Sequence, residues 1–200
     1  MFISFEGIDG SGKSTQAALL AAALGDDALL LREPGGTPVG ERLRELLKDP
    51  AVALSPRAEV LLFCSARAEL VEAVIRPALE AGRPVVCDRF MDSTVAYQGA
   101  ARGLGVELVT ELNTIAVAGC IPDRTVLLRL SREQAAGRGT ERGDYGSDRF
   151  EGEGARFQDE IAAAFERLAE AEPARIVAVD GDGEPEAVHA RVLAALGIAS

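Results

Sequence analysis

Cysteine is scarce in this chain of 200 residues, and the three that occur do not form a framework. Cys64, Cys87 and Cys120 are odd in number, widely spaced and set in apolar surroundings. A disulfide scaffold or a zinc site requires paired cysteines at characteristic spacings. We therefore expect buried, reduced thiols in a cytoplasmic protein, with neither a metal nor a disulfide at these positions.

Long apolar runs are also missing. No segment approaches roughly 18 apolar residues without a charge, and the N-terminus does not place a basic segment before an apolar one. We expect no membrane span and no signal peptide. The hydrophobic content of 48% excludes wholesale disorder and suits a single domain over residues 1–200.

The chain has few positively charged residues: it contains 21 basic and 32 acidic residues, which gives a net charge of −11. A nucleic-acid surface needs clustered excess positive charge, so no nucleic-acid partner is expected. A few arginines can still form a local pocket for small phosphorylated molecules. Only Lys13 and Lys48 are lysines, which is best explained by nucleotide bias in the genome.

A glycine-rich loop near the N-terminus carries one of these two lysines. It runs Gly7-Ile8-Asp9-Gly10-Ser11-Gly12-Lys13-Ser14-Thr15. Two glycines five apart, followed by Lys and Ser or Thr, are typical of a loop that cradles nucleotide phosphates. The lysine would meet the transferring phosphates and the first hydroxyl would ligate Mg²⁺. A glycine-rich turn without a ligand needs neither residue, so we predict a site for a nucleoside triphosphate such as ATP.

The alternation of apolar segments and helical patterns predicts an α/β fold. Strands are expected at residues 2–6, 28–31, 85–87, 125–130 and 176–179. Helices are expected at residues 13–24, 39–47, 57–81, 92–101, 106–118, 155–171 and 184–196, with Pro77 kinking or dividing the long one. This order implies a five-stranded parallel sheet with helices on both faces. Residues 137–154, rich in glycine and charge, are predicted to form a mobile lid.

The supply of arginine favours phosphoryl transfer to a small molecule. No Asn-Lys-x-Asp sequence occurs, so a GTPase is disfavoured. Transfer brings two phosphorylated substrates together, and guanidinium groups with Mg²⁺ can hold them in line. The available arginines are Arg32, Arg44, Arg67, Arg89 and, in the predicted lid, Arg138, Arg142 and Arg149.

Two helical spacings suggest an acceptor pocket. Phe63 and Arg67 are four residues apart, so a ring and a guanidinium would project from one helix face. The alternative is a core phenylalanine beside a solvent-facing arginine. Thr94, Tyr97 and Gln98 would share one polar face, for which the alternative is an amphipathic surface turn. Spacing alone leaves both pairs of alternatives open.

Together these segments resemble the thymidylate kinase family. The resemblance rests on residues 6–15, Arg32-Glu33-Pro34-Gly35-Gly36-Thr37, residues 63–67, Asp88-Arg89-Phe90 and residues 93–98. It extends over essentially the whole chain. It implies a P-loop kinase fold, transfer of the γ-phosphoryl group of ATP to dTMP with Mg²⁺ in dTTP synthesis, and a homodimer that forms through the long helices.

The resemblance also implies roles on the donor side. Lys13 would cradle the transferring phosphates, and residues 7–15 with Arg138 would bind ATP. Ser14 would hold the metal, and Asp88 would organise its water. The loop itself contains no arginine, so the chain resembles the type in which the lid supplies the catalytic one, with Arg142 favoured. The alternative is that the lid arginines only solvate a flexible loop.

On the acceptor side, the resemblance assigns the dTMP phosphate to Arg89 and Arg44, with Arg32 and Glu33 in support. Asp9 would contact the sugar or phosphate region. For the base, the resemblance implies that Phe63 stacks on thymine and that Arg67 hydrogen-bonds its exposed edge. The remaining base and sugar contacts would come from Thr94, Gln98 and, selecting the deoxy sugar, Tyr97. Phe90 replaces the Tyr or His often found there, which leaves the role of its ring open.

Two rival interpretations remain. One is a kinase of the same architecture that acts on another nucleotide or on a deoxynucleoside. The other is a nucleotide-binding regulatory protein that has kept the fold without turnover. The combination of Lys13, Asp88, Arg89 and the lid arginines argues against the second, because a pure binder has no need to exclude water from a reacting phosphate.

Overall fold

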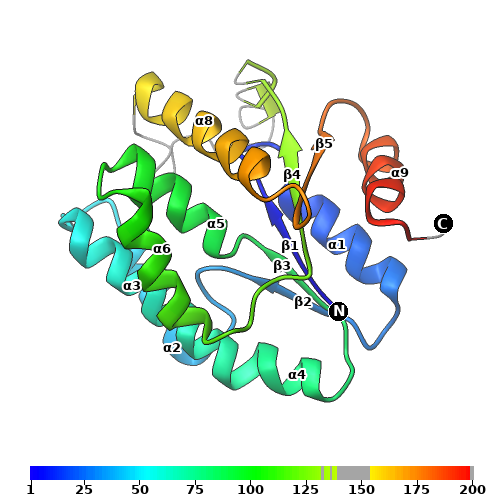
Figure 1. Cartoon of the computed structure of the whole chain (residues 1–200), viewed down its shortest axis with the longest axis horizontal. Coiled ribbons are helices and arrows are strands. Elements are labelled where there is room, and N and C mark those ends of the chain that lie inside the picture. Colours follow the sequence, from blue (N-terminus) through cyan, green and yellow to red (C-terminus); the bar gives the residue numbers. More distant parts are fainter. Residues whose placement is uncertain (132, 136, 139–153, 199–200) are drawn as a thin grey trace.

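The computed structural model describes residues 1–131, 133–135, 137–138 and 154–198 (Figure 1). Its strands form one parallel sheet in the order β2-β3-β1-β4-β5. They are β1 (Phe2–Glu6), β2 (Leu29–Arg32), β3 (Val85–Asp88), β4 (Arg124–Arg129) and β5 (Ile176–Asp180). The predicted five-stranded parallel sheet is confirmed, and each predicted strand bound lies within one residue of the observed one.

Helices connect the strands as predicted. They are α1 (Lys13–Leu24), α2 (Pro38–Lys48), α3 (Pro56–Leu70), α4 (Arg76–Glu80), α5 (Met91–Thr94), α6 (Val106–Val117), α8 (Ala155–Ala171) and α9 (Pro185–Leu196). Two further segments are π-helical: η1 (Val71–Ile75) and η2 (Val95–Ala101). The prediction of regular helices at residues 57–81 and 92–101 was therefore wrong in detail, because each contains a π-helical segment.

Pro77 explains the division of the first of these helices. Its ring removes one backbone N–H and crowds the carbonyl of residue 73, which disfavours regular α-helical hydrogen bonding at this point. The wider turn of η1 immediately precedes it, and α4 continues the helical path. The expectation that Pro77 divides the helix is confirmed.

The sheet separates two helical layers, which are visible in Figure 1. The helices α1 and α9 pack on one face, whereas α3, α4, α6 and α8 lie on the other (Figure 1). Side chains alternate along each strand, so Ile3 and Phe5 of β1 join the cluster under α1 and α9. Phe2, Ser4 and Glu6 consequently point to the opposite face.

The parallel arrangement brings the carboxyl ends of the strands to one edge of the sheet. Asp88 at the end of β3 is paired in register with Phe5 of β1 and with Arg32 of β2. Ligands of open α/β sheets bind outside this edge. The glycine-rich loop follows β1 directly, so phosphate-binding and charged side chains meet there.

The three cysteines are buried and free, as expected. Burial raises the pKa of each thiol, which keeps it protonated and unreactive. Within the described ranges, no cluster of three or more His, Cys, Asp or Glu side chains suits a metal ion. None of the described helices has the length and apolar character needed to cross a bilayer.

Candidate active site

The glycine-rich loop leads from β1 into α1 through backbone conformations that favour glycine. Gly7, Gly10 and Gly12 have φ angles of 140°, 81° and 96°. A Cβ at Gly10 would lie 2.5 Å from the carbonyl oxygen of Ala135, so a side chain is excluded there. No side chain caps the N-terminus of α1. Its first N–H groups and the positive end of the helix dipole are therefore suited to an anion.

Lys13 is buried within this loop. Its Nζ donates to the carbonyl oxygen of Ile8 at 2.7 Å. Burial, with the nearby charge of Arg89, lowers the pKa of Lys13 to about 8, although Asp9 and other carboxylates partly oppose this. The ammonium group is thus poorly solvated and held by a neutral carbonyl, which leaves it ready to meet a phosphate.

Asp88 and Ser14 form a short polar pair at the edge of the sheet. Ser14 Oγ donates to Asp88 Oδ2 at 2.5 Å. Asp88 Oδ1 is buried without a hydrogen-bond partner. Mg²⁺ commonly takes only one or two protein oxygens and keeps water and phosphate oxygens for its other positions. The orphaned carboxylate oxygen and the adjacent hydroxyl fit such an ion.

The Arg89 guanidinium lies between the loop and η2. Its Nη2 donates to Asp9 Oδ1 and, at 3.2 Å, to Tyr97 Oη. Its Nη1 donates to the Gly7 carbonyl at 3.2 Å and to Ser93 Oγ at 3.0 Å. Burial raises the pKa of Asp9, but the charges of Arg89 and Lys13 outweigh this and lower it to about 2. The arginine and the aspartate therefore form a charged pair at neutral pH.

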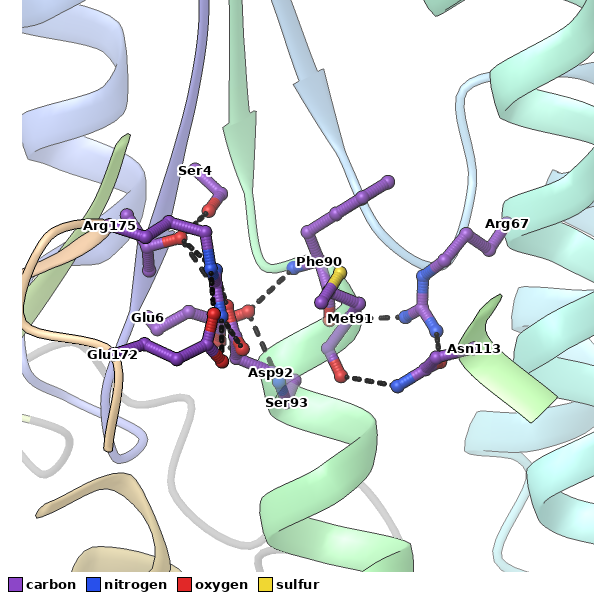
Figure 2. Close-up of polar contacts among 11 residues, drawn as sticks. Ser4, Glu6, Arg67, Phe90, Met91, Asp92, Ser93, Asn113, Glu172 and Arg175 are labelled. Atoms are coloured by element: carbon purple, nitrogen blue, oxygen red, sulfur yellow. Dashed lines mark hydrogen bonds and ion pairs between the residues drawn. The ribbon is translucent and has the colours of Figure 1, made fainter. Parts of the chain in front are cut away.

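Glu6 holds the segment that carries Arg89 in place. Its Oε1 accepts hydrogen bonds from the N–H of Phe90 at 2.8 Å and the N–H of Ser93 at 3.1 Å (Figure 2). Its Oε2 accepts from Ser93 Oγ at 2.6 Å. No side chain from α5 caps its own N-terminus, so Glu6 supplies the cap from β1. Because the Ser93 hydroxyl gives its hydrogen to Glu6, its lone pairs face Arg89.

A second charged group lies beside this cap. Arg175, which precedes β5, donates from both terminal nitrogens to Asp92, each at 2.7 Å (Figure 2). It also donates to Thr125 Oγ1 at 2.9 Å and to Glu172 at 2.8 Å. The network ties α5 to the end of α8 and to the interior of the sheet.

Arg67 is fixed on the opposite side of α5 (Figure 2). Its Nε and Nη2 donate to Glu33 Oε2 at 2.8 and 2.6 Å, and Nη2 also donates to the Phe90 carbonyl at 3.1 Å. Its Nη1 donates to Asn113 Oδ1 at 2.6 Å, and Asn113 in turn donates to the Met91 carbonyl. These bonds engage four of the five guanidinium hydrogens. The alternative of a solvent-facing Arg67 was wrong, because only 1% of this residue is exposed.

The ring of Phe90 belongs to the core. It is fully buried and meets the Phe2 ring edge-on, with centroids 5.0 Å apart. The Arg67 guanidinium lies over it, 5.2 Å from the centroid. The Phe90 ring is therefore a packing platform for Arg67, which answers the question that the sequence left open.

A cavity of about 230 Å³ joins the glycine-rich loop to this arginine-rich wall. It brings together most of the residues that the sequence predicted for both substrates. Those lining it are Asp9, Gly10, Gly12, Lys13, Ser14, Arg32, Glu33, Arg44, Phe63, Arg67, Asp88, Arg89, Thr94, Tyr97 and Gln98. Other predicted site residues do not line it: Gly7, Ile8, Ser11, Thr15 and Arg138.

Arg44, predicted to hold the dTMP phosphate, and its predicted supports Arg32 and Glu33 have partners of their own. Arg44 Nη1 donates to the Pro34 carbonyl at 2.8 Å. Arg32 pairs with Glu41 at 3.1 Å on the exposed side. Glu33 supports the wall of the cavity through Arg67, and its second oxygen is buried without a partner.

Arg138 lies next to the phosphate loop although it does not line the cavity. Its Nη2 donates to the carbonyls of Gly181 and Gly183 at 3.0 and 3.1 Å. Its Nη1 would lie 3.7 Å from a Cβ placed at Gly12. Arg142 and Arg149, with residues 139–153 of the predicted lid, fall outside the described residues.

Sequence reasoning missed the residues that position the site. Asp92 and Arg175 lie in no segment that carried the resemblance, and no role was predicted for Glu6 or Ser93, which do lie in such segments. The one available signal was Glu6, a carboxylate at the end of a predicted strand whose other residues are apolar or small. A carboxylate buried in such surroundings needs a hydrogen-bonding partner.

The comparisons with known proteins agree with one another. The model of the thymidylate kinase family matches residues 5–192. A thymidylate kinase of Rhizorhabdus wittichii is 51% identical over 199 residues, covering 98% of this chain and 96% of that protein. One from Caldanaerobacter subterraneus is 48% identical over 198 residues, covering 98% and 94%. The crystal structure of thymidylate kinase from Ehrlichia chaffeensis superposes with a TM-score of 0.81 at 33% identity, covering 98% of each chain.

Glu6 should make stability depend on pH. Burial and the negative charge of Asp92 raise its pKa from 4.5 to about 7. The folded protein therefore binds more protons than the unfolded chain between these values, so this contribution is complete below pH 4.5 and is lost as pH rises through about 7. In Glu6→Gln the contribution should vanish. Urea unfolding at pH 5 and pH 8 should show that wild type loses on the order of 2 kcal/mol relative to the variant over this interval. A constant difference between the two proteins would contradict this.

Proposed function

The chain belongs to the thymidylate kinase family, and we propose that it transfers the γ-phosphoryl group of ATP to dTMP, forming ADP and dTDP, the precursor of dTTP. The observation that carries this proposal is the continuous cavity that links the phosphate loop with Arg89, Phe63 and Arg67. The phosphate of a nucleoside monophosphate in this space would face the loop, where it would meet the terminal phosphate of a donor triphosphate. We place this activity in the cytoplasm.

The donor site is built from backbone and one lysine. The N–H groups at the start of α1 would bind the phosphates of ATP, and Lys13 would exchange the Ile8 carbonyl for a phosphate oxygen. Arg138 lies beside Gly12 and would assist in holding ATP. These donors are in position before substrate binds, so little reorganisation is needed in the transition state.

Ser14 and Asp88 would hold the magnesium ion, directly or through its water. Their fit rests on the unpaired buried oxygen of Asp88 and its contact with the Ser14 hydroxyl. When bound, Mg²⁺ neutralises charge on the transferring phosphates.

The acceptor phosphate would lie against Arg89 and Arg44. Its oxygen is the nucleophile and is already ionised near neutral pH, so no general base is required. In the substrate-free site, the terminal nitrogens of Arg89 are engaged by Asp9, Tyr97 and two other acceptors. The phosphate would therefore meet Nε or displace one of these partners, which gives Asp9 a role in positioning the arginine.

The thymidine part of dTMP fits the remaining wall. Phe63 offers a ring for stacking, and Arg67 retains one guanidinium hydrogen for the edge of the base. Thr94 and Gln98 would add contacts to the base. The Tyr97 hydroxyl donates to Asp9 at 3.0 Å, which holds the ring, and this ring would select the deoxy sugar by opposing a ribose 2′-hydroxyl.

We also propose a homodimer formed through α3 and α6. These helices pack against each other and expose large apolar side chains: Leu61 is 52%, Leu108 is 47% and Ile115 is 76% exposed. Exposed apolar side chains on adjoining helices suit a second copy of the same surface.

The acceptor preference tests the main proposal. ADP release with ATP and Mg²⁺ should be fast with dTMP and slower with dUMP, UMP, dCMP, AMP or thymidine at equal concentration. Turnover with another monophosphate in preference to dTMP would assign the chain a different acceptor. No turnover with any of them, despite ATP binding, would favour a regulatory nucleotide-binding protein.

Lys13→Ala should lower kcat by at least about a hundredfold, because one preorganised donor to the transferring phosphate is lost. Among the residues that the structure describes, its Nζ hydrogen-bonds within the loop, so thermal unfolding should change little. Near-normal turnover in a folded variant would refute the role of this lysine.

The affinity for nucleotides should also depend on the protonation of Lys13. Its pKa is about 8 in the substrate-free site, and a bound polyphosphate would raise it. ADP affinity should therefore weaken as pH rises above 8, approaching tenfold per pH unit, with proton uptake on binding. Calorimetry from pH 7.5 to 9.5 in buffers of different ionisation enthalpy measures both effects. Lys13→Met should bind ADP with little dependence on pH over this range, and an unchanged slope would assign it to another group.

The dimer should separate when charge is placed on the shared surface. Ile115→Asp is expected to shift sedimentation from dimer to monomer, whereas Val39→Asp on α2, at a residue that is 49% exposed, should not. A wild-type protein that sediments as a monomer at micromolar concentration would contradict the proposed dimer.

A further inference from the structure

A buried carboxylate lies behind the wall of the cavity. Glu59 of α3 is 1% exposed and does not line the cavity, whereas its neighbour Gln98 of η2 does. Gln98 Nε2 donates to Glu59 Oε1 at 2.8 Å. The side-chain amide of Gln98 is thus held between the carboxylate on one side and the substrate space on the other.

This contact fixes the orientation of the amide. A carboxylate accepts hydrogen bonds and donates none, so only the NH₂ end of Gln98 can face it. The reversed amide would set its carbonyl oxygen against a buried negative charge, which is strongly unfavourable. The carbonyl oxygen of Gln98 is therefore directed away from Glu59, toward the cavity.

Arg102 pairs with Glu59 and holds it in place. Its Nε donates to Glu59 Oε1 at 3.3 Å, and its guanidinium lies over the Phe157 ring, 4.7 Å from the centroid. A positive partner offsets the cost of burying the carboxylate. Glu59 therefore acts as an acceptor that remains beside Gln98.

We propose that Glu59 is a positioning residue for base selectivity: it orients Gln98 so that the cavity presents a hydrogen-bond acceptor to position N3 of the pyrimidine. Thymine and uracil carry a hydrogen on N3 and can donate it. Cytosine has a lone pair at N3, so two acceptors would face each other. The inference rests on the proposed binding of the thymine ring in this cavity.

Glu59→Gln tests the inference, because a glutamine can donate as well as accept. Gln98 could then adopt either orientation and accommodate cytosine. We expect the ratio of kcat/KM for dCMP to that for dTMP to rise about tenfold, while the ratio of dUMP to dTMP stays unchanged. General damage to the site would lower all three values together. An unchanged dCMP to dTMP ratio in a folded, active variant overturns the proposal.

The double variant Glu59→Gln/Gln98→Glu is the matched control. Residue 59 would then donate to residue 98, which would again present only acceptor oxygens to the cavity. The charge is unchanged overall, and the preference against dCMP should return. A double variant as permissive as the single one would contradict the orientation argument.

An analogue tests the same contact in the wild-type protein, independently of whether Glu59→Gln folds. Methylating N3 of dTMP removes the donor and keeps both ring carbonyls as acceptors. We expect about a tenfold loss of kcat/KM, and no loss would overturn the proposal. Wild-type turnover of dTMP is measured first: its absence defeats the proposed function, whereas normal turnover with unchanged selectivity in Glu59→Gln defeats only the role of Glu59.

Discussion

The buried carboxylate of Glu6 is the constraint on which the arrangement of the site depends. It is the last residue of β1. Its side chain accepts hydrogen bonds from the backbone N–H groups of Phe90 and Ser93, which follow it by 84 and 87 positions. This bond sets where α5 begins, and Arg89 immediately precedes that point with a φ of 67°. The phosphate loop and Arg89 are therefore both held at the carboxyl end of β1. Because both are anchored there, their separation does not depend on the longer connections of the fold.

The site concentrates positive charge inside an acidic protein by distributing negative partners around it. Arg89 lies close enough to Lys13 to disfavour the charged form of the lysine, while Asp9 of the loop pairs with Arg89 and favours it. Arg67 is balanced by Glu33 on the other side of α5. The positive charge that lines the substrate-free cavity is therefore partly balanced, and an incoming phosphate exchanges partners with carboxylates already in place.

The sequence predicted the strands and the phosphate loop well because their signals are local. An apolar segment followed by glycines and a lysine specifies its own conformation, as residues 2–15 show. The π-helical segments were not predicted, and the burial of Arg67 was missed because it depends on distant groups. Glu33 and Asn113 lie 34 and 46 positions from Arg67, so the spacing of residues along the helix does not predict these partners. The same distance conceals Glu6 as a cap and Glu59 as the partner of Gln98.

The π-helical segment η2 makes chain length as important as residue identity. Its backbone bond from Arg102 to Tyr97 closes over five residues, so the segment contains more chain per turn than an α-helix. Removing one residue between positions 98 and 101 would take out the extra residue and contract the segment to the narrower turn of an α-helix. Tyr97 and Gln98 would then lose their alignment with α6 and α8. A substitution in this segment changes one side chain and can leave the backbone as it is. Insertions and deletions here should be rare among related proteins that phosphorylate the same acceptor.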